Sequence, residues 1–500
     1  MSDESYQSPT YGNITPPGKQ GFWGLSLGVL GIAGFLLFMV MIATIVTQYI
    51  AAGVLALLAI AVVIASVFKD KSDRTIYQRG VIRMFFRSRE RRGDTVLVQG
   101  PAGRAPDGRT RLPGLLAPSE LSEHVDSYGH RFGLIRLRGV KHYTVVLEVF
   151  PDGDALVDAE RVDSMVAHWG AWLAALGESG DIVGASVSVE TSEETGQRLE
   201  RMVNGKLDET ASDYARDVAK SLPEEIRANT PMVSTRIAIT FSGRGFDKEG
   251  SDQGLQAMAA EIGARLPILM VDLGSTGAGS GVRACTAPDI VDHARAAYDP
   301  IVAPAIEQAR ADGGTGLTWA DAGPVFQREH IDRYYHDRAV SKTWEMHVPP
   351  TGTFRSSSLG AVLRPVSGVL RKRVTLLYRP VWDKDAVDAV GKEGSNAEMV
   401  NSAKSTAAQR RRLRAARQSE EELQDGAGLL LFGLLVTATT TNTAEFARLD
   451  KVIPGLTSRA GRLRMREALG NQAVAFQAGL PLGVVPMAHA PLGQFIQEWI

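Results

Sequence analysis

The residues of this chain closest to a phosphate-binding motif form the glycine-rich run at 274–281. A P-loop exposes backbone N–H groups through its glycines and then supplies Lys and Ser or Thr for phosphate and magnesium. Here no lysine follows, Arg283 comes late, and a predicted helix precedes the run where a P-loop has a strand. We interpret the run as a flexible loop, with a nucleotide-binding site as the alternative.

The histidines do not have the spacing of a metal or catalytic site. His330 and His336 are six residues apart, which would place them on different faces of a helix, and solvated surface positions are expected for both. Asp289 and His293 fit a surface pair at i and i+4. No H-E-x-x-H occurs in the sequence, and its one G-x-S-x-G, at 24–28, falls in an uncharged apolar segment. We therefore predict no catalytic, metal-binding or cofactor-binding residues and a protein that is not an enzyme.

Composition narrows the class of protein. A net charge of −1 over 500 residues does not favour nucleic-acid binding by bulk electrostatics. The single cysteine, Cys285, excludes internal disulfides and fits a reducing cytosol. No histidine lies near it in sequence to form a nucleophilic pair.

A long uncharged segment organises the chain. Residues 21–68 contain no Asp, Glu, Lys or Arg, and about 20 apolar residues form one helical membrane crossing. The length predicts a transmembrane hairpin of helices at about 22–46 and 50–68, with polar residues Thr44, Thr47 and Gln48 near the turn. Four glycines form a candidate helix-packing face on the first helix: Gly24, Gly28, Gly31 and Gly34.

Basic residues follow the second helix. Their excess predicts that this side is cytoplasmic, so the protein would be two-pass in the cytoplasmic membrane with both termini inside the cell. Residues 76–86 are predicted as a helix on an anionic membrane surface, with a plain cytoplasmic stop signal as the alternative. The candidate membrane-surface basic residues are Lys69, Lys71, Arg74, Arg79, Arg83 and Arg87.

The rest of the chain alternates strand-like and helix-like segments. Strands are predicted at 142–150, 182–191 and 233–242, and helices at 157–176, 193–222 and 253–271. After a linker the order recurs, with strands at 373–381 and 429–440, a long helix at 397–423 and another helix beginning at 443. The segment 429–440 could also be a third membrane span, although its length favours a buried strand.

The predicted fold class is therefore α/β (α+β), a transmembrane hairpin followed by two cytoplasmic sandwich-like modules. The boundaries are residues 1–20 (disordered tail), 21–68 (hairpin), 69–130 (basic juxtamembrane segment), 131–345 (first module), 346–370 (linker) and 371–500 (second module).

Two groups of residues are candidate partner interfaces. Trp169 and Trp172 share the apolar side of one predicted helix, where core packing is the favoured role and a partner interface is the alternative. Basic residues precede three glutamates on another helix, where they pair along the helix, are solvated, or bind nucleic acid or an acidic partner. They include Arg410, Arg411, Arg412 and Arg414.

Seven segments resemble a membrane protein family encoded in actinobacterial integrative conjugative elements. They are RLPGLLAPSEL (111–121), HYTVVL (142–147), VAHWGAWL (166–173), GGTGLTWADAG (313–323), RKRVTLLYRP (371–380), GLLVTAT (433–439) and AFQAGLPLGV (475–484). The family looks like a PrgI-like two-helix membrane subunit fused to the N-terminal domain of the type IV secretion (conjugation) ATPase, without the motor domain.

The resemblance implies a non-enzymatic scaffold of a conjugative DNA-transfer complex that docks the traffic ATPase to the membrane. The expected partners are membrane lipid, the conjugation ATPase, other channel subunits and further copies of this chain, with no direct DNA contact. The alternatives are a type VII secretion component of the EccE kind and a membrane-tethered nucleotide-binding enzyme that uses the 274–281 loop.

Overall fold

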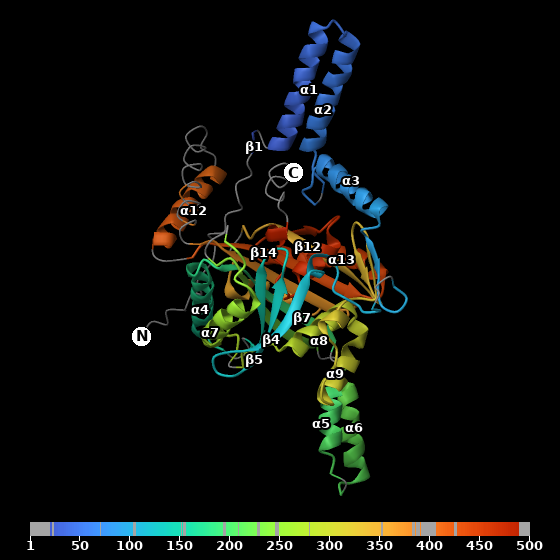
Figure 1. The fold of residues 1–500 in the computed structure, drawn as a ribbon, viewed down its shortest axis with the longest axis vertical. Helices are drawn as coiled ribbons and strands as arrows, with labels where there is room; N and C mark the ends of the chain where they lie inside the picture. The colour runs from blue at the N-terminus through green and yellow to red at the C-terminus, as the bar shows by residue number, and fades with distance from the viewer. Residues whose placement is uncertain are drawn as a thin grey trace, which may run out of the picture.

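The computed structural model describes residues 21–22, 25–70, 72–103, 107–151, 153, 157–193, 197–208, 210–227, 231–245, 250–279, 281–351, 354–382, 386, 391, 407–424 and 428–489. Two apolar helices, α1 (Leu27–Ile45) and α2 (Tyr49–Val67), form a hairpin at one end of the molecule (Figure 1). The turn between them includes Thr47 in the left-handed region, at φ 62°. Two two-residue strands, β1 (Gly21–Phe22) and β2 (Leu25–Ser26), pair ahead of α1.

Within the described residues, one helix is long and apolar enough to cross a membrane, over Tyr49–Ser66 of α2. The apolar part of α1 described with its side chains, Gly31–Ile45, is shorter than a crossing requires. The hairpin is thus present as two helices, and the two-pass arrangement stays a prediction.

A third helix, α3 (Ile76–Arg92), links the hairpin to the body. Thr75 and Gln78 form a capping box at its start, and Gly93 ends it at φ 79°. The predicted helix at 76–86 is confirmed and continues for six further residues.

The body is built on one antiparallel sheet of 13 strands, which confirms the α+β class. Its order is β3-β10-β11-β12-β14-β13-β7-β8-β6-β5-β4, with β15 paired to β12 and β9 paired to β6. In chain order the strands are β3 (Val96–Val98), β4 (Ser119–Val125), β5 (Arg131–Leu137), β6 (His142–Val149), β7 (Ile182–Glu193), β8 (Pro231–Ser242), β9 (Arg283–Ala284), β10 (Phe326–Glu329), β11 (Tyr334–His336), β12 (Ala339–Val348), β13 (Arg371–Pro380), β14 (Leu430–Thr440) and β15 (Arg464–Glu467).

All five predicted strands are present, as β6, β7, β8, β13 and β14. The alternative of a third membrane span at 429–440 is wrong, because β14 is hydrogen-bonded to β12 on one side and to β13 on the other. The linker predicted at 346–370 does not divide the sheet, since β13 also pairs with β7 of the first predicted module.

Helices cover both faces of the sheet. One face carries two apolar clusters, packed by α4 (Ala159–Glu178) with α7 (Leu255–Gly274), and by α10 (Gly360–Leu363) with α13 (Phe446–Arg459). The opposite face packs against α8 (Ala287–Tyr298) and α14 (Gln472–Ala478). Alternate residues of β6 point to opposite faces. Val145 and Leu147 lie in the cluster packed by α4 and α7, while Val146 lies on the face that packs against α8 and α14.

The predicted helix at 193–222 is two helices, α5 (Gln197–Gly205) and α6 (Asp213–Arg227). The Ser212 hydroxyl accepts a hydrogen bond from the Ala215 amide, which caps the start of α6. They extend from the β7–β8 connection, next to α9 (Ala303–Ala311) (Figure 1). Of the predicted helix at 397–423, α12 (Ala407–Gln424) is described, and residues 397–406 lie outside the described residues.

Candidate functional surfaces

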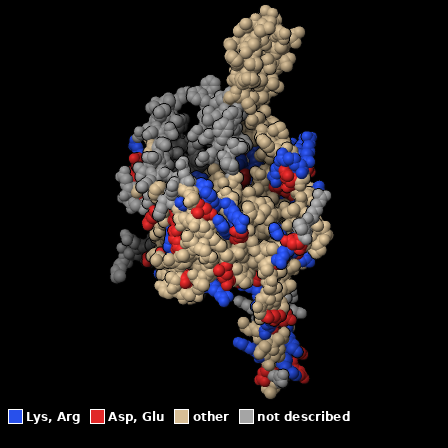
Figure 2. Space-filling view, viewed as in Figure 1, with Lys and Arg blue, Asp and Glu red and all other residues tan. Residues whose placement is uncertain are grey.

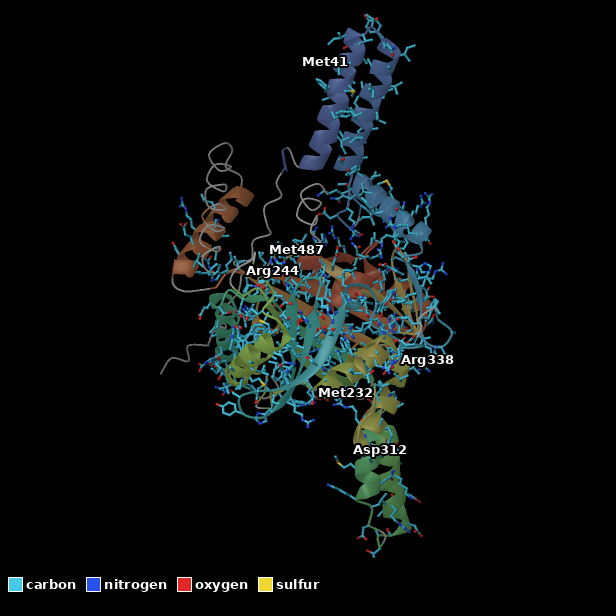
Figure 3. All side chains as sticks on the ribbon, viewed as in Figure 1. Met41, Met232, Arg244, Asp312, Arg338 and Met487 are labelled. Atoms are coloured by element: carbon cyan, nitrogen blue, oxygen red, sulfur yellow. The ribbon has the colours of Figure 1, made fainter. Side chains whose placement is uncertain are left out.

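The α1–α2 hairpin carries an exposed apolar surface. Figure 2 shows no charged side chain on it, in contrast to the body. Ile50 is 87% exposed and Ile45 72%, and Met41 lies exposed on α1 (Figure 3). An exposed apolar surface of this kind marks a site for membrane or protein contact.

The glycine face of α1 does not pack within this chain where it is described. Gly31 and Gly34 are exposed, and a Cβ added at Gly34 would meet no atom within 4 Å. Gly28 is described by its backbone alone, and Gly24 lies outside the described residues. The described part of the face is therefore open to another helix, and its role in packing stays a prediction.

Three of the predicted basic residues after α2 form ion pairs with carboxylates. Arg74 was predicted to face the membrane surface, and this is wrong: it is 4% exposed and pairs with Glu345 at 3.1 Å. Lys69 pairs with Asp73, and Arg79 pairs with Asp70, both at 3.1 Å. Carboxylates therefore pair with three of the basic residues of this segment.

Arg83 and Arg87 remain as the exposed basic residues of the predicted set on α3. They lie on the same side of the helix as Met84, which is 61% exposed. Lys71 lies outside the described residues. The surface suited to an anionic bilayer is thus the outer side of α3.

The inner side of α3 is fixed to the sheet. Phe86 is buried, and Arg89 donates to the Glu329 carboxylate at 2.7 Å and to the Gly470 carbonyl at 3.2 Å. Before the helix, Glu345 accepts from both Arg74 and Arg466. These contacts hold the base of the hairpin in one position on the body.

Trp172 is part of the core. It is 4% exposed, stacks on Trp169 with ring centroids 5.0 Å apart, and donates to the Leu269 carbonyl at 3.3 Å. Trp169 is partly buried and lies edge-on to Tyr378. Core packing, the favoured role, therefore describes this pair, and Trp172 does not offer a partner interface.

The basic candidates on α12 are described in part. Arg414 lies exposed on the helix, whereas the side chains of Arg410, Arg411 and Arg412 lie outside the described residues. Their role as a partner interface stays a prediction.

The glycine-rich run 274–281 is packed against the body in its described part. A Cβ at Gly279, where φ is +87°, would overlap the carbonyl oxygen of Phe150, and one at Gly277 would lie 3.0 Å from the Met165 sulfur. The run also follows the carboxyl end of α7, where helix carbonyls disfavour a phosphate. Close packing explains these glycines without a ligand.

The predictions for His336 and His293 were wrong in their structural setting, whereas His330 is partly exposed. His336 lies on β11 and is fully buried, with Nδ1 2.5 Å from the Tyr298 carbonyl oxygen and Nε2 2.7 Å from the Ser341 hydroxyl. Burial lowers its pKa to about 4. His293 is not half of a surface pair either, because its Nε2 atom is buried. This burial lowers the pKa of His293 well below the usual value. Its predicted partner Asp289 pairs instead with Arg283 at 3.0 Å.

Sequence reasoning missed a buried ion cluster at the centre of the sheet. Glu190 on β7 accepts two hydrogen bonds from Arg373, at 2.6 and 2.9 Å, and pairs with Arg371 at 2.9 Å. Lys372 between them points to the opposite face and donates to the Val362 carbonyl. The one available signal was the Arg-Lys-Arg run at the start of a predicted strand.

Cys285 is 2% exposed in the core, and burial raises its pKa to about 12. Such a thiol is poorly suited to act as a nucleophile. In the described part of the chain, no group of three or more His, Cys, Asp and Glu residues could hold a metal ion.

Three of the segments that carry the family resemblance meet in one core cluster. Leu116, Ala322 and Phe476, from 111–121, 313–323 and 475–484, are all fully buried there. The Gln477 side chain accepts from the Leu115 amide and donates to the Pro113 carbonyl, both at 3.0 Å. These three segments therefore support the fold.

Comparison with protein-family models and with curated proteins finds no match for this chain.

Proposed function

We propose that this protein is a membrane-anchored, non-enzymatic scaffold of a type IV secretion complex that docks a conjugation ATPase at the cytoplasmic membrane. The observation that carries the anchor is the uncharged, exposed surface of the α1–α2 hairpin beside a charged body (Figure 2). The secretion role rests on the resemblance of the seven segments described above. Both helices of the hairpin cross the bilayer in this proposal, with both chain termini in the cytoplasm.

The attachment of α3 supports a scaffold. A subunit that positions a partner relative to the membrane needs a stiff connection between its anchor and its body. The Arg89–Glu329 and Arg74–Glu345 ion pairs, each with one partner at most 5% exposed at its side chain, provide such a connection. The outer side of α3, with Arg83, Met84 and Arg87, then lies on anionic headgroups.

The anchor is tested with a fluorophore on Met84→Cys in proteoliposomes that contain spin-labelled anionic lipid. We expect strong quenching at this position and none for the matched label at Tyr214→Cys, which lies on α6 at the other end of the molecule. Equal quenching at the two positions, or failure of the protein to float with the vesicles, would refute membrane anchoring through the hairpin.

ATPase docking is tested by co-purification of the full chain with the ATPase encoded in the same element. Point substitutions are used, because a truncation before residue 371 would remove β13 and β14 from the middle of the sheet. Charge reversal of Arg414 on α12 is expected to reduce recovery of the ATPase, whereas the matched reversal of exposed Arg459 on α13 is not. If the unaltered chain does not recover the ATPase, docking is refuted.

A further inference from the structure

A polar cleft lies at the base of the α1–α2 hairpin, where the connection from α2 to α3 meets the body. Its volume is about 320 Å³. Asp70 and Asp73 line it from the connection, and His347 of β12, Ser458 of α13 and Arg464 of β15 line it from the body. Figure 1 shows α13 below the base of the hairpin. The cleft therefore joins the proposed anchor to the sheet.

The connection brings two carboxylates to this cleft. The Asp73 amide donates to the Asp70 carbonyl at 2.9 Å, which keeps the two residues close together. Both side chains are partly exposed. Each carboxylate binds one basic residue, Arg79 for Asp70 and Lys69 for Asp73. Because an ionised carboxylate has about four lone-pair sites, both can accept further hydrogen bonds from a bound group.

The body brings hydrogen-bond donors to the same cleft. Arg464 is exposed, and its guanidinium forms no ion pair with any residue that the structure describes. A guanidinium matches the oxygens of a phosphate, and the Ser458 hydroxyl is a second donor. His347 lies where β12 changes register against β15, and burial lowers its pKa, so its ring is uncharged at neutral pH. The cleft thus combines carboxylates with a guanidinium that they do not neutralise.

The cleft lies within reach of lipid headgroups if α2 spans the bilayer. α2 ends at Val67, and Asp70 follows three residues later. Three residues of extended chain reach at most about 11 Å, and the headgroup layer on each side of the hydrocarbon is roughly 5–8 Å thick. A group that carries both charges and is held at this depth is the headgroup of a zwitterionic phospholipid.

We propose that this cleft binds the headgroup of a phospholipid with a primary amine, of the phosphatidylethanolamine class. The ammonium group donates to the two carboxylates, and the phosphate accepts from Arg464 and Ser458. The quaternary ammonium of phosphatidylcholine has no N–H to donate, so the carboxylates distinguish these two lipids. The inference rests on the proposed membrane anchor and names the lipid that the base of the anchor binds.

Native mass spectrometry of the full chain in detergent tests the site, with dioleoyl-phosphatidylethanolamine or dioleoyl-phosphatidylcholine added. We expect the ethanolamine lipid to bind about tenfold more tightly, because a hydrogen bond to a charged group contributes that much or more. Neither lipid has a net charge, so contacts with the exposed basic residues of α3 should not distinguish them. Equal affinity for the two lipids would overturn the proposal.

Two substitutions separate the two halves of the headgroup. Asp73→Asn keeps the shape of the side chain at φ 56°, which asparagine tolerates, and should abolish the preference for the ethanolamine lipid. Arg464→Gln should weaken both lipids to a similar extent, because both contain the phosphate. Arg459→Gln is the matched control, since Arg459 is exposed at the end of α13 and does not line the cleft. A preference that survives Asp73→Asn, or that Arg459→Gln removes, would overturn the assignment.

Soluble phosphoethanolamine distinguishes a lipid from a free phosphoamine. It carries the same charged groups but lacks the acyl chains that can lie along the exposed apolar hairpin, so we expect much weaker binding. Binding as tight as that of the lipid would identify a soluble ligand and overturn the lipid assignment. Flotation of the protein with vesicles of phosphatidylcholine alone reports on the anchor, so failure of the anchor is distinguishable from absence of the headgroup preference.

Discussion

Replacing Glu190 with glutamine tests how strongly the buried ion cluster stabilises the sheet. Glu190 is 5% exposed and lies between Arg371 and Arg373, which are 8% and 3% exposed. The substitution keeps the shape of the side chain but leaves two guanidinium groups in the core without their carboxylate. Breaking a buried pair in this way costs about 3–5 kcal/mol. We expect the free energy of unfolding to fall by about that amount.

The dependence on pH gives a second, independent readout. Burial alone would raise the pKa of Glu190, but the charges of Arg371 and Arg373 outweigh burial and hold the pKa well below its usual value. The unfolded chain therefore binds this proton more readily than the folded one. The stabilisation is complete above the unfolded pKa of about 4.3 and is lost as the pH falls below it. The difference between wild type and Glu190→Gln should be constant from about pH 6 to 8 and shrink below about pH 4.

The measurement is denaturant unfolding of the full chain in detergent, followed by the fluorescence of its tryptophans, among them the buried Trp344. Glu120→Gln is the matched control, because Glu120 pairs with Arg136 and Arg138 at the surface, where its side chain is 40% exposed. Exposed pairs contribute at most about 1 kcal/mol. If Glu190→Gln destabilises the protein no more than Glu120→Gln, or if the difference does not shrink in acid, the reasoning is refuted.

Three further outcomes follow from single residues. Gly279→Ala should destabilise the protein by roughly 1–3 kcal/mol, because Gly279 has a positive φ and an added Cβ would overlap Phe150. Gly274→Ala is the control, because an added Cβ there meets no atom within 4 Å, and the two variants are compared by thermal unfolding. Burial lowers the pKa of Lys372 to about 8, so the folded chain releases this proton at a lower pH than the unfolded chain. The free energy of unfolding, relative to that of Lys372→Met, should therefore rise between about pH 8 and 10. A difference that does not change with pH would contradict the burial of this charge. Cys285 should react with a thiol reagent only after unfolding, and rapid reaction of the native protein would contradict its burial.

The strands that sequence predicted are those whose own composition favours a sheet. Residues 142–149 and 430–440 are rich in β-branched and apolar side chains and read as strands without knowledge of their partners. The strand Ser119–Val125 contains two glutamates and two serines, and Phe326–Glu329 is largely polar, so neither has that signal. Their place in the sheet depends on pairing with distant segments.

The burial of polar residues was the least predictable feature of the candidate surfaces. Arg74 looks like part of a basic membrane-facing run, yet Glu345, 271 residues later, holds it against the body. His336 looks solvated until the Tyr298 carbonyl and the Ser341 hydroxyl are brought to its two ring nitrogens. In each case a distant partner satisfies the buried group, and one sequence does not show which distant residues meet.

The order of strands in the sheet has a consequence for how the chain is made. The two strands that join its halves, β13 and β14, come late, at residues 371–440, while their outer neighbours β7 and β12 end at residues 193 and 348. During synthesis at roughly 5–20 residues per second, several seconds pass between the end of β12 and the end of β14. Through that interval both halves of the sheet expose an unpaired edge to solvent, and such edges invite pairing with other chains. The sheet therefore assembles correctly only if both edges stay free of other chains until β13 and β14 have been synthesised, and a chaperone that shields the edges would favour this.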